Sequence, residues 1–375
     1  MNNIISIKNC YGCGVCAIAC SQKLIEIVLS SDGFYEPHIA EKDKCTNCNL
    51  CVDVCAYLDN DILREKYDIK SYAAWSLNEQ TRRDCSSGGI GFEIGKQLIQ
   101  KGYKACGVKY NAEMNRAEHF VATTVEEFVP SIGSKYIPSY TLSGFKQINR
   151  KEKYLITGTP CQIDSFRRYI RKLKIERNFV LLDFFCHGIP SMLMWKKYTE
   201  MVEKQTGVID SVSWRDKENG WQDSWVIKVG STYKSSFSKG DLFFKMFLGN
   251  FCMGKACYKK CKYKYDRSVA DIRIGDLWGE KFKDNENGVS ALLVLTEKGN
   301  EIISQLNDCH LEEMPLRIAA EGQMKTSLSK PYIYKLILRA LKSRKTLPEI
   351  YTYISILHIP KRVLKKICSL IKNMI

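Results

Sequence analysis

Two cysteine runs with identical spacing stand within the first 55 residues of the chain. The pattern C-x2-C-x2-C-x3-C is formed first by Cys10, Cys13, Cys16 and Cys20, and again by Cys45, Cys48, Cys51 and Cys55. The chain has 375 residues and 17 cysteines, so these eight are strongly concentrated. The first residues show no basic and apolar stretch typical of a secretion signal. We therefore expect a cytoplasmic protein whose cysteines bind metal rather than form disulfides.

This spacing resembles that of bacterial ferredoxins carrying two 4Fe-4S clusters. In such a loop three closely spaced thiolates wrap one cluster, and the fourth opens a short helix and serves the other cluster. We assign one cluster to Cys10, Cys13, Cys16 and Cys55, and the other to Cys20, Cys45, Cys48 and Cys51. Apolar residues between the runs predict a short hairpin over residues 24–27 and 33–37. Zinc is the alternative metal, and the matched four-cysteine runs disfavour it.

The rest of the chain predicts a different architecture. Residues 61–70 are charged and are expected to be a linker between a ferredoxin-type domain (1–60) and a larger domain (71–320). Apolar runs there alternate with helical patterns, which favours an α/β domain. The fold class is therefore an α+β ferredoxin-like domain, a larger α/β domain and a helical basic tail (321–375). Strands are expected at 71–75, 154–157, 179–185 and 272–274, helices at 90–102 and 163–173, and a polar turn at 78–84.

Small residues and cysteines follow several of these expected strands. Residues 86–89, Ser-Ser-Gly-Gly, precede a helix and form a candidate anion loop, with an ordinary capped helix as the alternative. Cys161 and Cys186 each follow a buried strand, where ligands bind in open α/β sheets. Cys257 and Cys261 lie in a lysine-rich segment that favours thiolate. A buried, inert thiol is the alternative for these four, and we accept it for Cys106, Cys309 and Cys368.

Taken in order, these motifs resemble the beta-subunit family of coenzyme F(420)-reducing hydrogenases and dehydrogenases. The matching pieces are residues 86–89, Gly133-Ser134-Lys135-Tyr136, Gly158-Thr159-Pro160-Cys161-Gln162, Cys186-His187-Gly188, the Cys257 and Cys261 pair, and Gly275-Asp276. The segment Cys-His-Gly-Ile-Pro-Ser at 186–191 is similar to a bacterial subgroup associated with surface polysaccharide biosynthesis, in which the deazaflavin substrate is not expected.

The resemblance implies two further cofactors. A non-covalent FAD would be bound by Ser87, Gly88, Gly89, Ser134, Lys135, Thr157, Gly158, Thr159, Pro160 and Gln162. A third 4Fe-4S cluster would be held by Cys161, Cys186, Cys257 and Cys261. The family's last pair is usually C-x2-C, whereas this chain has C-x3-C, so Cys252 and Cys85 are alternative ligands.

These features favour an iron-sulfur flavoprotein oxidoreductase. Electrons from a ferredoxin-like donor protein would pass through the clusters to FAD and on to a small-molecule substrate. One alternative is an electron-transfer subunit that feeds a partner enzyme, and another is an interaction protein that has lost the flavin. Residues 211–247 are expected to line the substrate pocket, or else to fill the core, with Trp214, Arg215, Trp221, Trp225 and Phe237.

The C-terminal segment is strongly basic in a chain of net charge +16. Residues 331–375 contain ten lysines or arginines and a single acidic residue, Glu349. Residues 332–341 and 360–374 have apolar residues at helical spacing. These helices either pack on the larger domain or lie on an anionic membrane surface. No recognition motif accompanies the charge, so nucleic acid is not an expected partner.

Overall fold

The structure of the protein is a computed structural model, which describes residues 3–4, 7–62, 64 and 66–357. The cysteine-rich part folds as a two-stranded sheet with two short helices: α1 (Val15–Ala19), β1 (Ile25–Leu29), β2 (Tyr35–Ile39) and α2 (Leu50–Asp53). Strands β1 and β2 pair antiparallel, with Ile25 opposite Ile39, and this confirms the expected hairpin. Each helix begins directly after a left-handed residue, Gly14 for α1 and Asn49 for α2.

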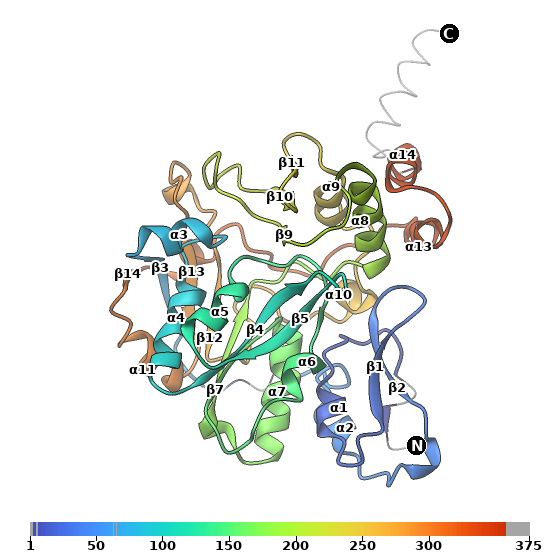
Figure 1. Ribbon diagram of the computed structural model, residues 1–375. Coiled ribbons are helices and arrows are strands. Elements are labelled where there is room, and N and C mark those ends of the chain that lie inside the picture. The colour runs from blue at the N-terminus through green and yellow to red at the C-terminus, as the bar shows by residue number, and fades with distance from the viewer. Residues whose placement is uncertain (1–2, 5–6, 63, 65, 358–375) are drawn as a thin grey trace, which may run out of the picture.

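A nine-stranded mixed sheet is the centre of the larger domain (Figure 1). In spatial order its strands are β14 (Cys309–Glu313), β3 (Lys70–Ser76), β13 (Ser290–Val294), β12 (Ile272–Asp276), β8 (Phe179–Phe184), β7 (Tyr154–Thr157), β4 (Lys104–Asn111), β5 (Arg116–Ala122) and β6 (Ser139–Tyr140). The four central strands β12, β8, β7 and β4 run parallel. Their carboxyl ends therefore meet at one edge, as the strand predictions require.

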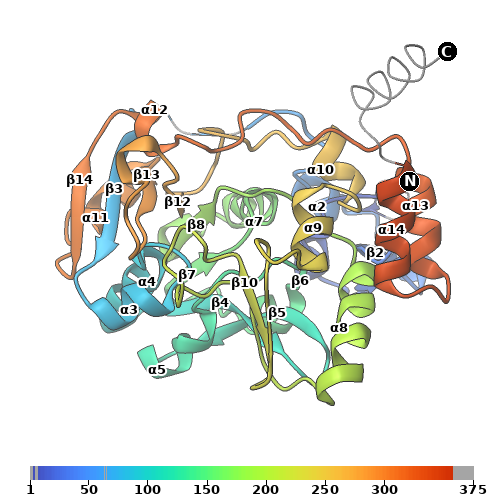
Figure 2. The same cartoon turned by 90° about the horizontal axis from the view of Figure 1, so that it is seen from above.

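Helices cover both faces of this sheet (Figure 2). The alternation of side chains along a strand sends Leu155 to the core beneath α4 and Ile156 to the core beneath α7. The helices of this domain are α3 (Glu79–Asp84), α4 (Ile90–Gln100), α5 (Val125–Phe128), α6 (Leu142–Phe145), α7 (Pro160–Lys172), α11 (Glu297–Ile303) and α12 (Leu316–Ala319). Residues 78–84, expected as a turn, instead form α3, because the Asn78 side chain accepts the Thr81 N–H and caps the helix.

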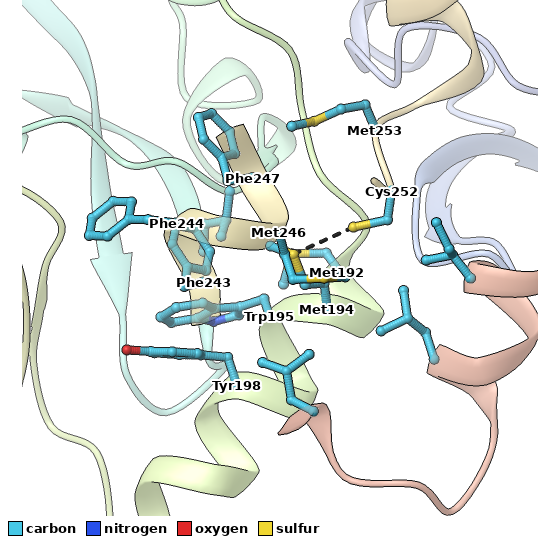
Figure 3. Packing of buried hydrophobic residues seen from close by; sticks show 14 of the residues in the cluster. Met192, Met194, Trp195, Tyr198, Phe243, Phe244, Met246, Phe247, Cys252 and Met253 are labelled. Carbon is cyan, nitrogen blue, oxygen red and sulfur yellow. Dashed lines mark hydrogen bonds between the residues drawn. The ribbon is translucent and has the colours of Figure 1, made fainter. Parts of the chain in front are cut away.

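A second core lies beside the sheet and is built from helices and a small sheet. Its elements are α8 (Met192–Thr206), β9 (Val212–Ser213), β10 (Val226–Val229), β11 (Tyr233–Ser236), α9 (Leu242–Leu248), α10 (Lys255–Lys259), α13 (Tyr334–Lys342) and α14 (Leu347–Leu357). Figure 3 shows aromatic and sulfur side chains of α8 and α9 interlocked there, with the Cys252 thiol hydrogen-bonded to the Met194 sulfur. Cys252 is therefore a core residue of this region.

The cysteine-rich part is docked firmly on the rest of the molecule (Figure 1), where α1 contacts α6 and α7. The Thr141 hydroxyl donates to the Cys13 carbonyl at 3.0 Å, and the Ala56 N–H donates to the Ser165 hydroxyl at 3.2 Å. At the hairpin turn, the Met192 N–H donates to the carbonyl of Gly33. A Cβ at Gly33 would lie 2.5 Å from the Ser191 hydroxyl, so the close approach depends on glycine there.

The basic C-terminal segment divides into two parts. Residues 334–342 form α13, whose apolar face is buried in the second core through Ile337, Leu338 and Leu341. The expected helix at 360–374 and Cys368 lie outside the described residues. Within the described part of the chain, none of the helices combines the length and apolar character needed to cross a bilayer.

Candidate functional site

The eight N-terminal cysteines fall into two spatial groups. The thiol of Cys16 interacts electrostatically with those of Cys13, Cys10 and Cys55. The thiol of Cys51 interacts with those of Cys20, Cys48 and Cys45. Each group thus takes three cysteines from one run and the fourth from the other run, which is the crossed arrangement expected from the sequence. Cys16 also interacts with Cys51, so the two groups are neighbours.

A third group joins cysteines from three distant segments. Electrostatic interactions connect Cys161 with Cys186 and Cys257, and connect both Cys186 and Cys257 with Cys261. Cys161 lies in the first turn of α7, and Cys186 follows β8. Burial raises the pKa of the Cys186 thiol to about 12, and the nearby Lys264 ammonium opposes this rise. The structure therefore brings together the four cysteines expected to hold a third cluster.

The Cys257 and Cys261 pair spans the end of α10. Cys257 lies in α10, and Cys261 follows the residue that ends this helix, Lys260. The backbone leaves the helical conformation at Lys260, so the direction of the Cys261 thiol is set by the segment after α10. Cys261 also interacts electrostatically with Tyr11 of the cysteine-rich part, as do Cys161 and Cys257.

A large cavity opens next to this third group of cysteines. Its volume is about 520 Å³, and it is bounded by the loops at the carboxyl ends of β7, β8 and β12 and by the start of α4. All four cysteines of the third group line it, together with Cys10 of the first group. Pockets for cofactors and small ligands typically span about 300–1,000 Å³, so this cavity has the size of a cofactor site.

The residues expected to bind FAD gather around this cavity. It is lined by Ser87, Gly89, Ser134, Lys135, Thr157, Gly158, Thr159, Pro160 and Gln162. Gly88 lies behind the wall, where its N–H donates to the Ser290 hydroxyl. A Cβ at Gly88 would lie 2.4 Å from the Ala74 carbonyl oxygen, so glycine here serves packing between α4 and the sheet.

The N-terminal ends of α7 and α4 both face the cavity, and they differ in whether a side chain caps them. In α7 the Thr159 N–H donates to the Gln162 side chain at 2.9 Å, and Thr159 Oγ1 lies 3.2 Å from Cys161 Sγ. In α4 the residue before the helix is Gly89, which has no side chain to cap the first amides. The start of α4 is therefore the better position for an anionic group.

Lys135 adds a cationic group to the same wall. Its ammonium donates to the carbonyls of Pro130 and Ile132 at 2.9 and 2.8 Å. A lysine ammonium has three donors, so a third remains for a ligand. Burial lowers the pKa of Lys135 to about 7, and the nearby Cys85 thiol acts against this. An anion bound beside Lys135 would raise this pKa again and favour the charged form.

Arg215 lies outside the cavity and connects the loops that form its wall. Its guanidinium donates to Asp276 Oδ2 at 3.0 Å, to the Tyr136 hydroxyl at 3.1 Å and to the Ser86 carbonyl at 3.2 Å. It also lies over the Trp225 ring. The other oxygen of this carboxylate, Asp276 Oδ1, is buried without a hydrogen-bond partner among the described residues. Because Asp276 lines the cavity, this oxygen is an acceptor available to a bound molecule.

The expectation that residues 211–247 line the substrate pocket is largely wrong. Trp214 and Trp221 are fully buried in two different hydrophobic cores, and Phe237 is exposed at the surface. Of the five side chains named for this segment, only Trp225 lines the cavity. The alternative, core packing, holds for the two buried tryptophans. Cys252 is buried in the second core, whereas Cys85 lines the cavity.

Several residues that line the cavity were not predicted from the sequence. Gly322, Gln323 and Met324 close one side of the cavity, and Phe34 and Tyr35 of the hairpin reach another. Tyr11 lies between the first and third cysteine groups. The sequence does give a signal for Tyr11, because it is an aromatic residue inside a cluster-binding loop. The other residues carry no pattern that separates them from ordinary turn and core positions.

Comparison with known proteins finds matches for both parts of the chain. Residues 151–316 match the family described as the C terminus of the coenzyme F(420) hydrogenase/dehydrogenase beta subunit, and residues 9–58 match the 4Fe-4S dicluster domain. The chain is 24% identical to the coenzyme F(420)-dependent sulfite reductase of Methanocaldococcus jannaschii, over 80% of this chain and 46% of that protein. It is 26% identical to the coenzyme F(420) hydrogenase subunit beta of Methanococcus voltae, over 50% of this chain and 61% of that protein.

The chain thus spans about half the length of these two curated relatives. A chain of the F(420)-reducing NiFe hydrogenase complex from Methanosarcina barkeri superposes with a TM-score of 0.48 and 17% identity, covering 79% of this chain and 94% of that one. The resemblance expected from the ordered motifs is confirmed by the family matches. The chain therefore joins a segment that matches the 4Fe-4S dicluster domain, residues 9–58, to a segment that matches the C-terminal family of the coenzyme F(420) hydrogenase/dehydrogenase beta subunit, residues 151–316.

Proposed function

We propose that this protein is an iron-sulfur flavoprotein oxidoreductase that takes electrons from a ferredoxin-like protein and reduces a small molecule. The observation that carries the proposal is the contiguity of three cysteine groups and one cavity. Cys51 neighbours Cys16, Cys13 neighbours Cys161, and the third group lines the cavity. Iron-sulfur clusters carry single electrons and a flavin stores two, so such a series suits one-electron donors and a two-electron substrate.

The cavity fits FAD by three features of its wall. The uncapped start of α4 suits a pyrophosphate, and Lys135 supplies a positive charge nearby. The unpartnered Asp276 Oδ1 suits an N–H or hydroxyl donor of the flavin. The chain's own contribution is to hold these groups in place, since Arg215 ties Asp276 and the Ser86 loop together. The family's relatives also suggest a deazaflavin as the alternative occupant.

The donor would dock at the second cysteine group. Cys48 is exposed, whereas the first group is turned toward the larger domain. Residues 186–191 are similar to a subgroup associated with surface polysaccharide biosynthesis. For this reason the substrate that we propose is a sugar-sized molecule. An electron-transfer subunit without its own substrate is the second candidate, since one relative is named as a hydrogenase subunit.

The first test is cofactor content. Anaerobically purified protein should contain about eight iron atoms from the dicluster domain and about four more from the third group. Acid extraction should release FAD, identified by chromatography. Protein holding about two metal ions, chiefly zinc, would contradict the cluster assignment, and protein with iron but without flavin would favour the electron-transfer subunit.

The second test places the flavin. Gly89→Glu should abolish flavin retention, because it introduces a negative charge at the start of α4. Gly102→Glu is the matched control: Gly102 follows the other end of α4, also has positive φ, and has open space around it. Lys135→Ala should weaken flavin binding by about 1.5–3 kcal/mol, with exposed Lys101→Ala as its control. Full flavin in both Gly89→Glu and Lys135→Ala would place the flavin elsewhere.

A further inference from the structure

The end of α10, which carries the third cysteine group's pair, is held by a residue of the dicluster domain. Tyr11 stands next to Cys10, and its hydroxyl donates a hydrogen bond of 2.5 Å to the carbonyl of Lys260. Lys260 directly follows α10 and directly precedes Cys261. Carbonyls at the end of a helix lack partners within the helix, so the Tyr11 hydroxyl caps α10 from another domain.

The ring of Tyr11 is also built into this junction. It is buried and meets the rings of Tyr57 and Tyr263 edge-on, at centroid distances of 5.3 and 5.8 Å. Cys161 and Cys261 pack against the same small cluster of side chains. The ring thus packs between the first and third cysteine groups, and it also lines the cavity.

A second anchor holds the residues just after Cys261. The Tyr263 hydroxyl donates to Asp164 Oδ2 at 2.7 Å, and Asp164 lies on α7, one turn after Cys161. The Ser327 hydroxyl donates to the carbonyl of Cys261 itself at 2.8 Å. Cys261 is therefore fixed on one side by the dicluster domain and on the other by the larger domain.

We propose that Tyr11 is a positioning residue that holds Cys261 in its ligating place and thereby makes the third cluster site depend on the docked dicluster domain. The inference rests on the proposed third cluster. It predicts that the site is completed across the boundary between the two domains. Loss of the Tyr11 hydroxyl should loosen the third cluster without removing a ligand.

The test compares Tyr11→Phe with the wild type, both purified anaerobically. Tyr11→Phe keeps the ring and removes the hydroxyl. It should release about four iron atoms per chain to a chelator roughly tenfold faster than the wild type, which corresponds to losing about 1.4 kcal/mol. The electron paramagnetic resonance signal of the third cluster should change as well. Tyr57→Phe is the matched control, because the Tyr57 hydroxyl forms no hydrogen bond within the described residues and its ring lies in the same cluster.

Tyr263→Phe provides a second variant, which removes the other anchor and should speed the same release. A wild type with only about eight iron atoms has no third cluster. That result would overturn both this inference and the proposed route to the cavity. A wild type with about twelve, matched by Tyr11→Phe and Tyr263→Phe in release rate and resonance signal, would overturn the role of Tyr11 and leave the proposed function standing.

Discussion

The two cysteine runs share one spacing and one backbone shape, yet they differ in the residues between their cysteines. Gly12 and Gly14 in the first run have φ of +67° and +73°, and Asn47 and Asn49 in the second have φ of +53° and +61°. Left-handed conformations are open to both residue types. The conformation alone therefore does not explain why one run uses glycine and the other asparagine.

The surroundings of the two loops explain the difference. A Cβ at Gly12 would lie 2.7 Å from the Tyr35 carbonyl oxygen, and one at Gly14 would lie 2.2 Å from Thr141 Oγ1. The first loop is thus pressed against the hairpin and the larger domain. The second loop has Asn47, Cys48 and Asn49 near the surface, with Cys48 exposed. The same cluster-binding motif therefore forms an internal contact in the first run and a loop at the surface in the second run.

The largest effect is expected when one cysteine ligand of each cluster is replaced in turn. Cys16→Ser and Cys48→Ser should each lose about four iron atoms per chain. Only Cys16→Ser should also destabilise the junction, by more than about 4 kcal/mol, because Cys16 lies on α1, which contacts α6 and α7. Iron analysis with urea unfolding checks this. Equal losses of stability in the two variants would show that the loops do not differ in structural role.

A smaller effect is expected when the first loop is given the residue of the second. Gly14→Asn allows the left-handed backbone but places a side chain against Thr141, so it should cost about 1–3 kcal/mol of stability. Combining it with Thr141→Ala should restore part of this loss, measured as a double-mutant cycle in urea. Additive losses would mean that the close approach at Thr141 is not the cause.

Sequence patterns predicted the parts of the site that depend on strand order and spacing. The crossed grouping of the eight cysteines follows from their spacing, and the meeting of Cys161 with Cys186 follows from parallel strands sharing an edge. The pairing of Cys257 with these two came from the resemblance. No local pattern brings α10 next to α7, since that contact depends on how the second core packs.

Side-chain direction was the main source of error. Trp214, Trp221 and Trp225 lie within one segment, and only Trp225 reaches the cavity, because the irregular backbone around them has no fixed period. Arg215 was expected in the pocket and instead stands behind its wall, where it joins three loops. The order of the antiparallel strands β3, β13 and β14 in the sheet was not predicted either, because the sequence of a short strand does not indicate which strand it pairs with.

The smallest expected effect is the reverse exchange in the outward loop. Asn49→Gly removes a side chain that makes no capping hydrogen bond to α2, and its φ of +61° suits glycine without strain. Relief of the left-handed strain and the greater freedom of glycine in the unfolded chain oppose each other, so unfolding should change by less than about 1 kcal/mol. Urea unfolding and iron content check this, with Gly14→Asn measured in parallel. A loss in Asn49→Gly as large as that in Gly14→Asn would show that the asparagine side chain is itself needed around the second cluster.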